Sequence, residues 1–313
     1  MNTRAPAVGH QQEVATGETG RLDRAVVRAT PGIYRRAWRR FRADHLAVAS
    51  LVIVVLIVVF ALCAPLVSKA TGFTYSENHL HDKLASPGEK GYLLGSDGNG
   101  RDILTRLAYG GRVSLLVAAF ATLSELGFGL GFGIVSGYYG KWIDSIIMRL
   151  VDVLLSIPTL PLLILIATLY SPGVVMLALI IGAIFWPGDA RLIRGEVLAH
   201  RGREYIEAAR VVGVPSRSII LRHLLPNVTP ILLVQASLAI PGVILTEAII
   251  SFLGLGVQVP TPSWGNMLNE AQRFYRTNWL NVFIPGFMIY ISALCLYLVG
   301  IGLRDALDPR LSD

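Results

Sequence analysis

The sequence predicts an all-α, polytopic membrane protein with six transmembrane helices. Of its 313 residues, 53% are hydrophobic and only 16% are charged, and its mean hydropathy is +0.56. This composition is too apolar for an ordinary soluble domain. The apolar residues also gather into runs of about 20, the length at which a helix crosses the hydrocarbon core of a bilayer.

The first 45 residues precede the apolar runs and divide into two parts. Residues 1–30 are polar and lack periodicity, so we expect a disordered cytoplasmic tail. Within residues 31–45, apolar side chains such as Trp38 and Phe41 fall on one helical face, opposite five arginines. This pattern is typical of a basic helix lying at a membrane surface. A nucleic-acid-binding arm is the alternative, but the apolar run that starts at Leu46 favours membrane lipid as the partner and no nucleic acid.

The transmembrane domain is expected to occupy residues 46–313. One apolar run, 174–186, lies between Pro172 and Pro187 and reaches spanning length only if its helix continues through Ala190. We count it as a span, the fourth in chain order, which brings the total to six. The other five runs are long enough without extension: 46–67, 113–135, 150–170, 230–253 and 282–303.

An even number of spans places both termini on one side of the membrane, and the basic residues indicate which side. Twenty of the 28 Lys and Arg residues lie in the N-terminal segment, the turn at 137–149, the loop after the fourth span and the C-terminus. The positive-inside rule therefore predicts that these four regions, including both termini, are cytoplasmic. The large loop 68–112 carries nearly balanced charges, as expected of an exported loop.

The polar stretch at about residues 190–227 predicts two short helices joined by a turn, an arrangement that we call the bracket. The first covers 204–212 and ends at Gly213, where we expect a left-handed C-cap. The second begins with Ser216 as its N-cap and stops before Pro226.

The first helix of this bracket also presents a surface of low relief. Ala208 and Ala209 stand between Glu207 and Arg210, so the surface of another protein can come close. Small residues permit such close packing between helices in membranes. We therefore interpret the loop as a docking surface.

The same loop resembles that of a known family. Glu-Ala-Ala-Arg-Val-Val-Gly at 207–213, followed by Leu-Pro at 225–226, is similar to the EAA loop of permease subunits of bacterial ATP-binding-cassette (ABC) importers. The sequence departs from the general pattern at His223 and at Ile301, where the family has an isoleucine and an acidic residue. Four further stretches resemble the C-type permease of dipeptide and oligopeptide importers: 223–227, 251–258, 262–268 and 303–309.

The resemblance implies the type I ABC importer permease fold in the bacterial cytoplasmic (inner) membrane. It implies three kinds of partner: a second homologous permease subunit that forms a heterodimer with this chain, two ATP-binding subunits, and an extracytoplasmic substrate-binding protein. ATP and magnesium would bind to the ATPase subunits, so we expect no cofactor, metal site or catalytic residue in this chain. The coupling contact with the ATPase would be made by Glu204, Glu207, Ala208, Ala209 and Gly213.

The resemblance further implies import of dipeptides or oligopeptides, with nickel as the alternative substrate in the same family. Only Cys63, Cys295 and three methionines lie within or beside the spans as soft ligands, and no histidine does. This scarcity argues against a path lined by metal ligands. The two cysteines also lack the spacing of a disulfide framework or a zinc site.

Four polar residues inside the predicted spans are candidates for lining the transport pathway, because ionisable groups in a bilayer are costly and typically functional. They are Glu125, Asp152, Glu247 and the neighbouring Gln235. A structural role is the alternative, since Asp152 could pair with Arg149 or reach the interface. Glu247 lies in the outer half of its span, after a Pro-Gly pair at 241–242, and is the better candidate for lining a cavity.

Other function classes fit the sequence less well. A self-contained secondary transporter could use Glu125, Asp152 and Glu247 as a proton relay. Such a protein has no need of a two-helix cytoplasmic loop, and the inverted repeats expected of many such folds are not evident. No residue spacing indicates a membrane enzyme.

Two glycine-rich stretches have the spacing of nucleotide-binding motifs without their chemistry. At 95–102, Arg101 stands in place of the phosphate-binding lysine and Asp102 in place of a Ser or Thr. We interpret this stretch as a turn before a helix. At 127–133, alternate glycines lie inside an apolar span and predict two close helix-packing faces.

Overall fold

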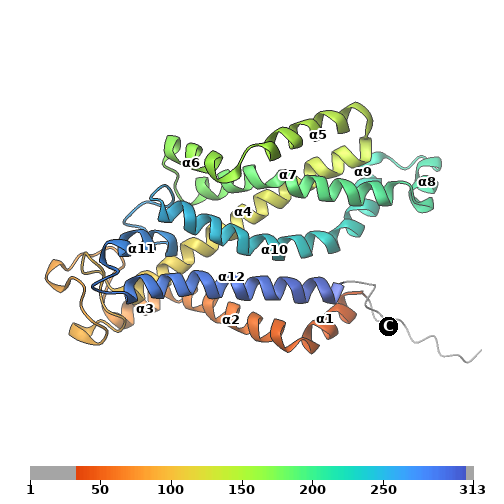
Figure 1. The fold of residues 1–313 in the computed structure, drawn as a ribbon. Coiled ribbons are helices and arrows are strands. Elements are labelled where there is room, and N and C mark those ends of the chain that lie inside the picture. Colours follow the sequence, from red (N-terminus) through yellow and green to blue (C-terminus); the bar gives the residue numbers. More distant parts are fainter. Residues whose placement is uncertain (1–32, 308–313) are drawn as a thin grey trace, which may run out of the picture.

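Long apolar helices run side by side along one axis of the molecule (Figure 1). The computed structural model describes residues 33–307, and this part of the chain forms helices and no β-strand. The predicted all-α membrane fold is confirmed, because five helices are long and apolar enough to cross a bilayer. They are α2 (His45–Leu62), α4 (Ile103–Tyr139), α7 (Val174–Arg201), α10 (Leu225–Phe252) and α12 (Leu280–Leu307).

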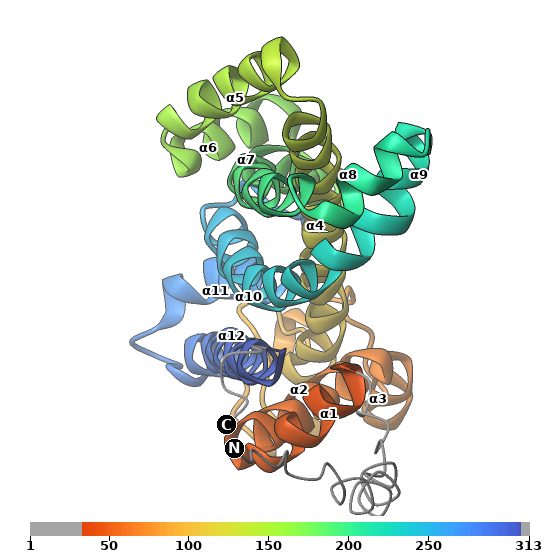
Figure 2. The same cartoon turned by 90° about the vertical axis from the view of Figure 1, so that its right-hand side faces the viewer.

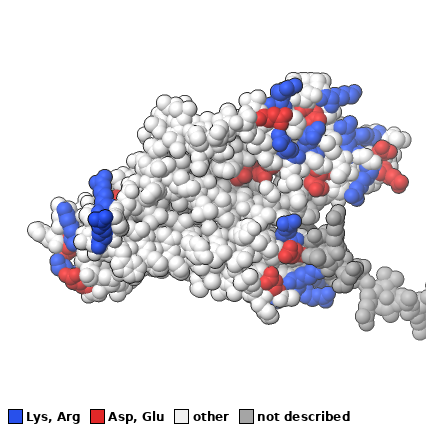
Figure 3. Space-filling view, in the orientation of Figure 1, with Lys and Arg blue, Asp and Glu red and all other residues white. Residues whose placement is uncertain are grey.

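Charged side chains gather at the two ends of the bundle and leave a broad, largely uncharged band between them (Figure 3). Large apolar side chains such as Leu56, Leu123 and Leu165 are exposed on the helices that cross this band. In water such a surface would promote association, whereas in a bilayer it contacts lipid. Helices satisfy their own backbone hydrogen bonds there, so the band marks the membrane-embedded part.

The third predicted span, 150–170, is not a straight helix. The chain forms α5 (Lys141–Ser156) and α6 (Thr159–Tyr170), which are bent by 86° at the break between them. Ile157 is extended, with φ −89° and ψ 127°, as expected for the residue before a proline. Pro158 therefore ends α5, and the prediction of one continuous span was wrong. The total is six spans if the bent pair counts as one.

The fourth predicted span, in contrast, is longer than its apolar run. The helix that begins at Val174 passes through Pro187 and continues to Arg201. Proline is tolerated inside spanning helices because neighbouring helices and local adjustments satisfy the backbone group that it frees. The expectation that this helix continues through Ala190 is confirmed.

Helices α4 and α7 approach each other closely along a row of glycines. A Cβ atom added at Gly129 or at Gly133 would come within 2.6 or 2.8 Å of α7, and one at Gly137 within 2.8 Å. These positions therefore need glycine for the helices to meet. Gly127 and Gly131 have no such neighbour within 4 Å, so only one of the two predicted packing faces is used within the described chain.

The N-terminal helix α1 (Ile33–Ala43) lies against the end of α12. Ala37 and Phe41 are buried and pack with Ala306 of α12, whereas Trp38 is exposed. A helix was predicted here, and its place at the membrane surface stays a prediction. The predicted disordered tail, 1–30, lies outside the described residues.

The opposite end of the bundle carries a cap of short segments. Their bounds are α3 (Ala64–Thr71), η1 (Leu80–Asp82), η2 (Glu89–Gly91), α11 (Trp264–Ala271) and η4 (Gln272–Phe274). Arg101 and Arg106 each donate to Glu270 of α11 at 2.7 Å, and Arg101 also pairs with Asp97 at 2.7 Å. These ion pairs hold the turn at 95–102 against α11. Asp102 is the N-cap of α4, which confirms the interpretation of this stretch as a turn before a helix.

Candidate functional site

The predicted docking loop projects from one end of the bundle as a short helix, α8 (Glu204–Val211), followed by α9 (Ser216–Ile219) (Figure 2). Ile206 anchors α8, because its side chain is fully buried among apolar residues that include Tyr138 of α4 and Val197 of α7. A helix of this length is not stable in isolation. The packing of Ile206 therefore fixes α8 to the ends of α4 and α7.

The turn after α8 forms at Gly213, as predicted. The Gly213 amide donates to the Arg210 carbonyl at 3.0 Å, and the Val214 amide donates to the Ala209 carbonyl at 3.0 Å. This pair of bonds is the Schellman arrangement of a helix end. Gly213 has φ +83°, a left-handed conformation that is costly for a residue with a Cβ atom.

The face of α8 away from the bundle is exposed. Glu204, Glu207 and Ala208 all lie on it, and within residues 33–307 neither carboxylate has an ion-pair partner. Val211 and Val212 follow at the tip of the helix, and they are 88% and 81% exposed. An exposed pair of acidic groups beside an apolar tip is suited to contact with another protein.

Two residues of the predicted low-relief surface contact the bundle instead. Ala209 is half-buried and packs into the apolar cluster beneath α8. The Arg210 guanidinium lies 5.4 Å from the ring centroid of Tyr138, a cation–π contact. The open surface therefore consists of Glu204, Glu207 and Ala208 together with Val211 and Val212. Sequence analysis did not single out this valine pair, although adjacent valines in a polar loop were an available signal.

The second helix of the bracket differs from its prediction. Pro215, not Ser216, is the N-cap of α9, and no side chain caps this end. The chain does not break at Pro226 either, because a π-helical segment, η3 (Ile220–Leu224), joins α9 to α10. Pro226 follows this segment as the second residue of α10.

As a consequence, the loop leads without interruption into a membrane span. Residues Ser216–Phe252 form one helical run of 37 residues. Pro230 and Pro241 both lie inside this run. The chain therefore passes from the turn at Gly213 into the helical run that carries Gln235 and Glu247.

The pathway candidate Asp152 lies at the surface between two helices. Its carboxylate pairs with Arg191 of α7, and its side chain is 61% exposed. The expected partner Arg149 is not the one that binds it. A second ion pair, between Asp144 and Arg194, also joins α5 to α7. The two pairs attach α5 to the half of α7 that leads to the docking loop.

Glu125 and Gln235, predicted separately as pathway residues, come together around a third residue. Asp189 of α7 lies close to both side chains. Glu125 and Asp189 are almost fully buried, and each retains one carboxyl oxygen without a hydrogen-bond partner. The cluster joins α4, α7 and α10 near the middle of their lengths. Buried, incompletely paired carboxyl groups at this depth are costly and point to a functional role.

Sequence analysis missed Asp189, although the predicted fourth span was expected to continue through Ala190 and so to contain it. An acidic residue directly after Pro187 and Gly188, in a run that continued to be helical, was the available signal.

Glu247, in contrast, is part of a fully bonded packing network. Its two carboxylate oxygens accept hydrogen bonds from Ser114 of α4 at 2.8 Å and from Ser251 at 2.7 Å. The Trp264 amide of α11 donates to the same Ser114 hydroxyl at 3.3 Å. Glu247 is completely buried and joins α4, α10 and α11. The structure places it in packing rather than against a cavity, so its role in the pathway stays a prediction.

Comparison with known proteins assigns this arrangement to a family. Residues 129–313 match the binding-protein-dependent transport system inner membrane component, and residues 32–87 match the N-terminal transmembrane domain of oligopeptide transport permease C. The chain belongs to this permease family. The permease is therefore a multi-pass protein of the inner membrane. The longer match covers the docking loop and all three helices that carry Asp152, Asp189 and Gln235.

Relatives of the permease resemble it along most of its length. It is 41% identical over 280 residues to the oligopeptide transport system permease protein OppC of Haemophilus influenzae, a match that covers 89% of each chain. It is 40% identical over 280 residues to OppC of Escherichia coli, covering 89% of this permease and 91% of the relative. The dipeptide transport system permease protein DppC of Alkalihalophilus pseudofirmus is 37% identical over 278 residues, covering 89% and 90% of the two chains.

Proposed function

We propose that this permease forms one half of a pathway that carries dipeptides or oligopeptides across the inner membrane. The relatives at 36–41% identity are named for oligopeptide, dipeptide or di/tripeptide transport, which supports peptides over nickel as the substrate. A second homologous permease supplies the other half of the pathway. An extracytoplasmic binding protein delivers the peptide, and two ATP-binding subunits on the cytoplasmic side hold ATP and magnesium.

The contact with an ATP-binding subunit is the exposed face of α8. One observation supports this most strongly: α8 is fixed to the bundle by Ile206 on one face, while Glu204, Glu207 and Ala208 are exposed on the other. A helix that is packed firmly on one face, and whose exposed carboxylates on the other face have no ion-pair partner, is suited to bind another subunit and to move with it. Gly213 contributes through the turn that it allows.

The contacts of α8 with other helices suggest how its movement is transmitted to the membrane-spanning helices. On one side, Ile206 joins α8 to α4 and α7, and on the other side the helical run Ser216–Phe252 continues into the bilayer. Rigid-body movement of an ATP-binding subunit would therefore displace α4, α7 and α10 together. These are the helices that hold Glu125, Asp189 and Gln235, so we infer that access to the pathway changes near this cluster.

The arrangement of the ends supports the proposed orientation. Helix α1, the turn between α4 and α5, helix α8 and the last residues of α12 all lie at the same end of the bundle (Figure 1). These are the regions in which the basic residues concentrate. With this end in the cytoplasm, α8 faces the compartment that contains ATP.

Uptake by membrane vesicles that contain the complete complex tests the substrate. We expect ATP-dependent accumulation of labelled dipeptides or oligopeptides when the binding protein is present. Nickel uptake in the same vesicles, without peptide uptake, would overturn the peptide assignment.

Cross-linking tests the contact at α8. Because the native cysteines Cys63 and Cys295 would react as well, the experiment starts from a chain in which both are replaced by Ala. A cysteine at Ala208 is expected to cross-link to an ATP-binding subunit, whereas one at Asn99, at the opposite end, is not. Equal cross-linking from both positions would contradict the proposed contact.

A further inference from the structure

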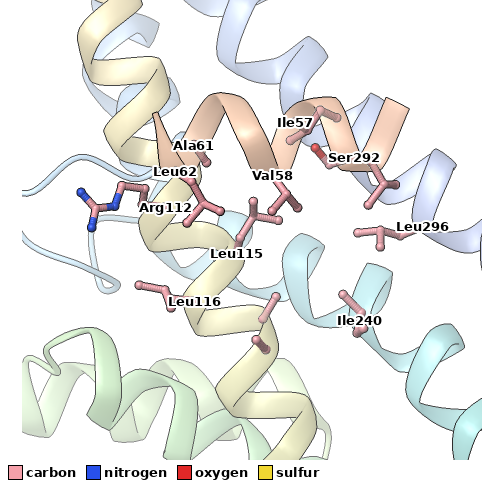
Figure 4. A pocket seen from close by; sticks show the side chains of 13 residues that line it. Ile57, Val58, Ala61, Leu62, Arg112, Leu115, Leu116, Ile240, Ser292 and Leu296 are labelled. Atoms are coloured by element: carbon pink, nitrogen blue, oxygen red, sulfur yellow. The ribbon is translucent and has the colours of Figure 1, made fainter. Parts of the chain in front are cut away.

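A groove on the side of the bundle lies between α2, α4, α10 and α12 (Figure 4). Its cavity measures about 400 Å³, within the size range of ligand pockets. All of the side chains that line it are aliphatic except those of Arg112 and Ser292. Leu62 and Leu116 line the groove and are themselves largely exposed, so the groove opens onto the apolar outer surface of the bundle.

The groove follows the outer half of α2, on the side away from α8. The α2 residues that line it extend from Val54 to Leu62, a distance of about 12 Å at 1.5 Å per residue. Leu62 is the last residue of α2. One end of the groove therefore lies where the span meets the membrane boundary, and the other lies inside the apolar band.

Arg112 stands at the boundary end of the groove, beside Leu62. Figure 4 shows its guanidinium group directed away from the aliphatic interior. Within residues 33–307 its guanidinium lies 5.7 Å from the ring centroid of Tyr109, and no carboxylate there pairs with it. A cation at this depth is suited to the phosphate of a lipid headgroup.

Ser292 lies at the inner part of the groove, on α12. The residue is 1% exposed, and its hydroxyl oxygen has no hydrogen-bond partner among the described residues. Buried hydroxyl groups are normally hydrogen-bonded, so this one calls for an acceptor that the chain does not supply. The groove thus has a cation at its mouth and an unpaired hydroxyl deeper in, with aliphatic side chains between and beyond them.

We propose that the groove binds one phospholipid. The phosphate pairs with Arg112, an acyl chain fills the aliphatic part, and an ester carbonyl accepts the hydrogen bond from Ser292. In a glycerophospholipid the ester groups lie between the phosphate and the acyl chains, and along α12 the aliphatic Leu296 lines the groove one turn beyond Ser292. The lipid joins α2 and α12 to α4 and α10, and is thus a structural ligand of the permease.

Charge favours a lipid over a spanning helix of the second permease as the occupant. An apolar helix would fill the aliphatic part but would leave both Arg112 and the Ser292 hydroxyl without partners. Bilayer phosphates, in contrast, are available at the depth of Arg112 wherever the groove faces lipid.

Native mass spectrometry of the purified complex, titrated with phosphatidylglycerol, tests the proposal. Arg112→Gln is expected to weaken binding about fivefold, the effect of one basic residue near a membrane surface, and Arg112→Lys should retain most of the affinity. Ala119→Phe, which fills the groove, and Ser292→Ala should also weaken binding. Lys69→Gln and Leu123→Phe are matched controls outside the groove and should leave lipid affinity unchanged.

Two results would overturn the proposal. One is equal lipid affinity in the wild type, Arg112→Gln and Ala119→Phe. The other is efficient cross-linking of a cysteine at Val58 to a spanning helix of the second permease, in a chain with Cys63 and Cys295 replaced by Ala. That result would make the groove an interface between subunits. Neither measurement depends on the identity of the transported substrate.

Discussion

Replacing Gly213 by Val is expected to weaken the attachment of the ATP-binding subunits without impairing membrane insertion. Gly213 has φ +83°, and a Cβ atom added there would meet nothing within 4 Å. The cost is therefore not a clash but the left-handed backbone itself, about 1–2 kcal/mol for a residue with a Cβ atom. The chain can escape this strain only by giving up the hydrogen bonds from Gly213 to Arg210 and from Val214 to Ala209.

A strain of this size lowers the fraction of molecules in which the native turn is formed. One to two kcal/mol changes an equilibrium by about 5- to 30-fold. If the ATP-binding subunits recognise only the native orientation of α8, their apparent affinity falls by the same factor wherever the strain disrupts the turn. The spans are held by packing elsewhere, such as the contact of Gly133 with α7, so the amount of permease in the membrane should not change.

Gly202→Val is the matched control. Gly202 lies in the same loop, has open space around its Cβ position and has φ −88° and ψ 6°, a turn conformation that does not require glycine. Both variants should be purified with their partner subunits, and retention of the ATP-binding subunits, ATP turnover and vesicle transport measured together. The reasoning is refuted if Gly213→Val equals the wild type in all three, or if Gly202→Val is equally impaired.

Three further predictions concern the docking contact, the helix packing and the topology. Glu207→Ala should lower ATPase retention or uncouple hydrolysis from uptake while leaving insertion intact, and wild-type retention and coupling would show that the carboxylate makes no contact. Gly133→Ala should destabilise the permease by about 1–3 kcal/mol through overpacking against α7, whereas Gly131→Ala should not, as thermal unfolding can show. In a chain without native cysteines, an impermeant probe applied to intact cells should label a cysteine at Asn99 and not one at Ser216, and the opposite pattern would invert the topology.

The positions of the spans could be predicted from the sequence because a bilayer demands long apolar runs. The shape of a span depends on local backbone chemistry that such a run does not reveal. Pro187 remains inside a continuous helix, whereas Pro158 follows a bend of 86°. Both prolines lie in or beside apolar runs, so the run alone does not tell which of them ends a helix.

The docking loop was more predictable than the buried polar groups. The turn at Gly213 is set by local sequence, and only the left-handed conformation stops the helix there. The surroundings of Glu125 and Glu247 are set by residues on other helices, which periodicity along one helix cannot identify. Asp189 of α7 lies beside Glu125, and Ser114 of α4 donates a hydrogen bond to Glu247. Two acidic residues in similar apolar runs therefore have different surroundings, one incompletely paired and the other fully hydrogen-bonded.

The energy source for peptide accumulation tests the central claim most directly. The measurement uses proteoliposomes that contain the permease with its second permease and both ATP-binding subunits, and it follows a labelled peptide as ATP, the binding protein and a proton gradient are supplied separately. Accumulation should require ATP and the binding protein together and should be indifferent to the gradient. Accumulation driven by the gradient without ATP would contradict the account and identify a secondary transporter.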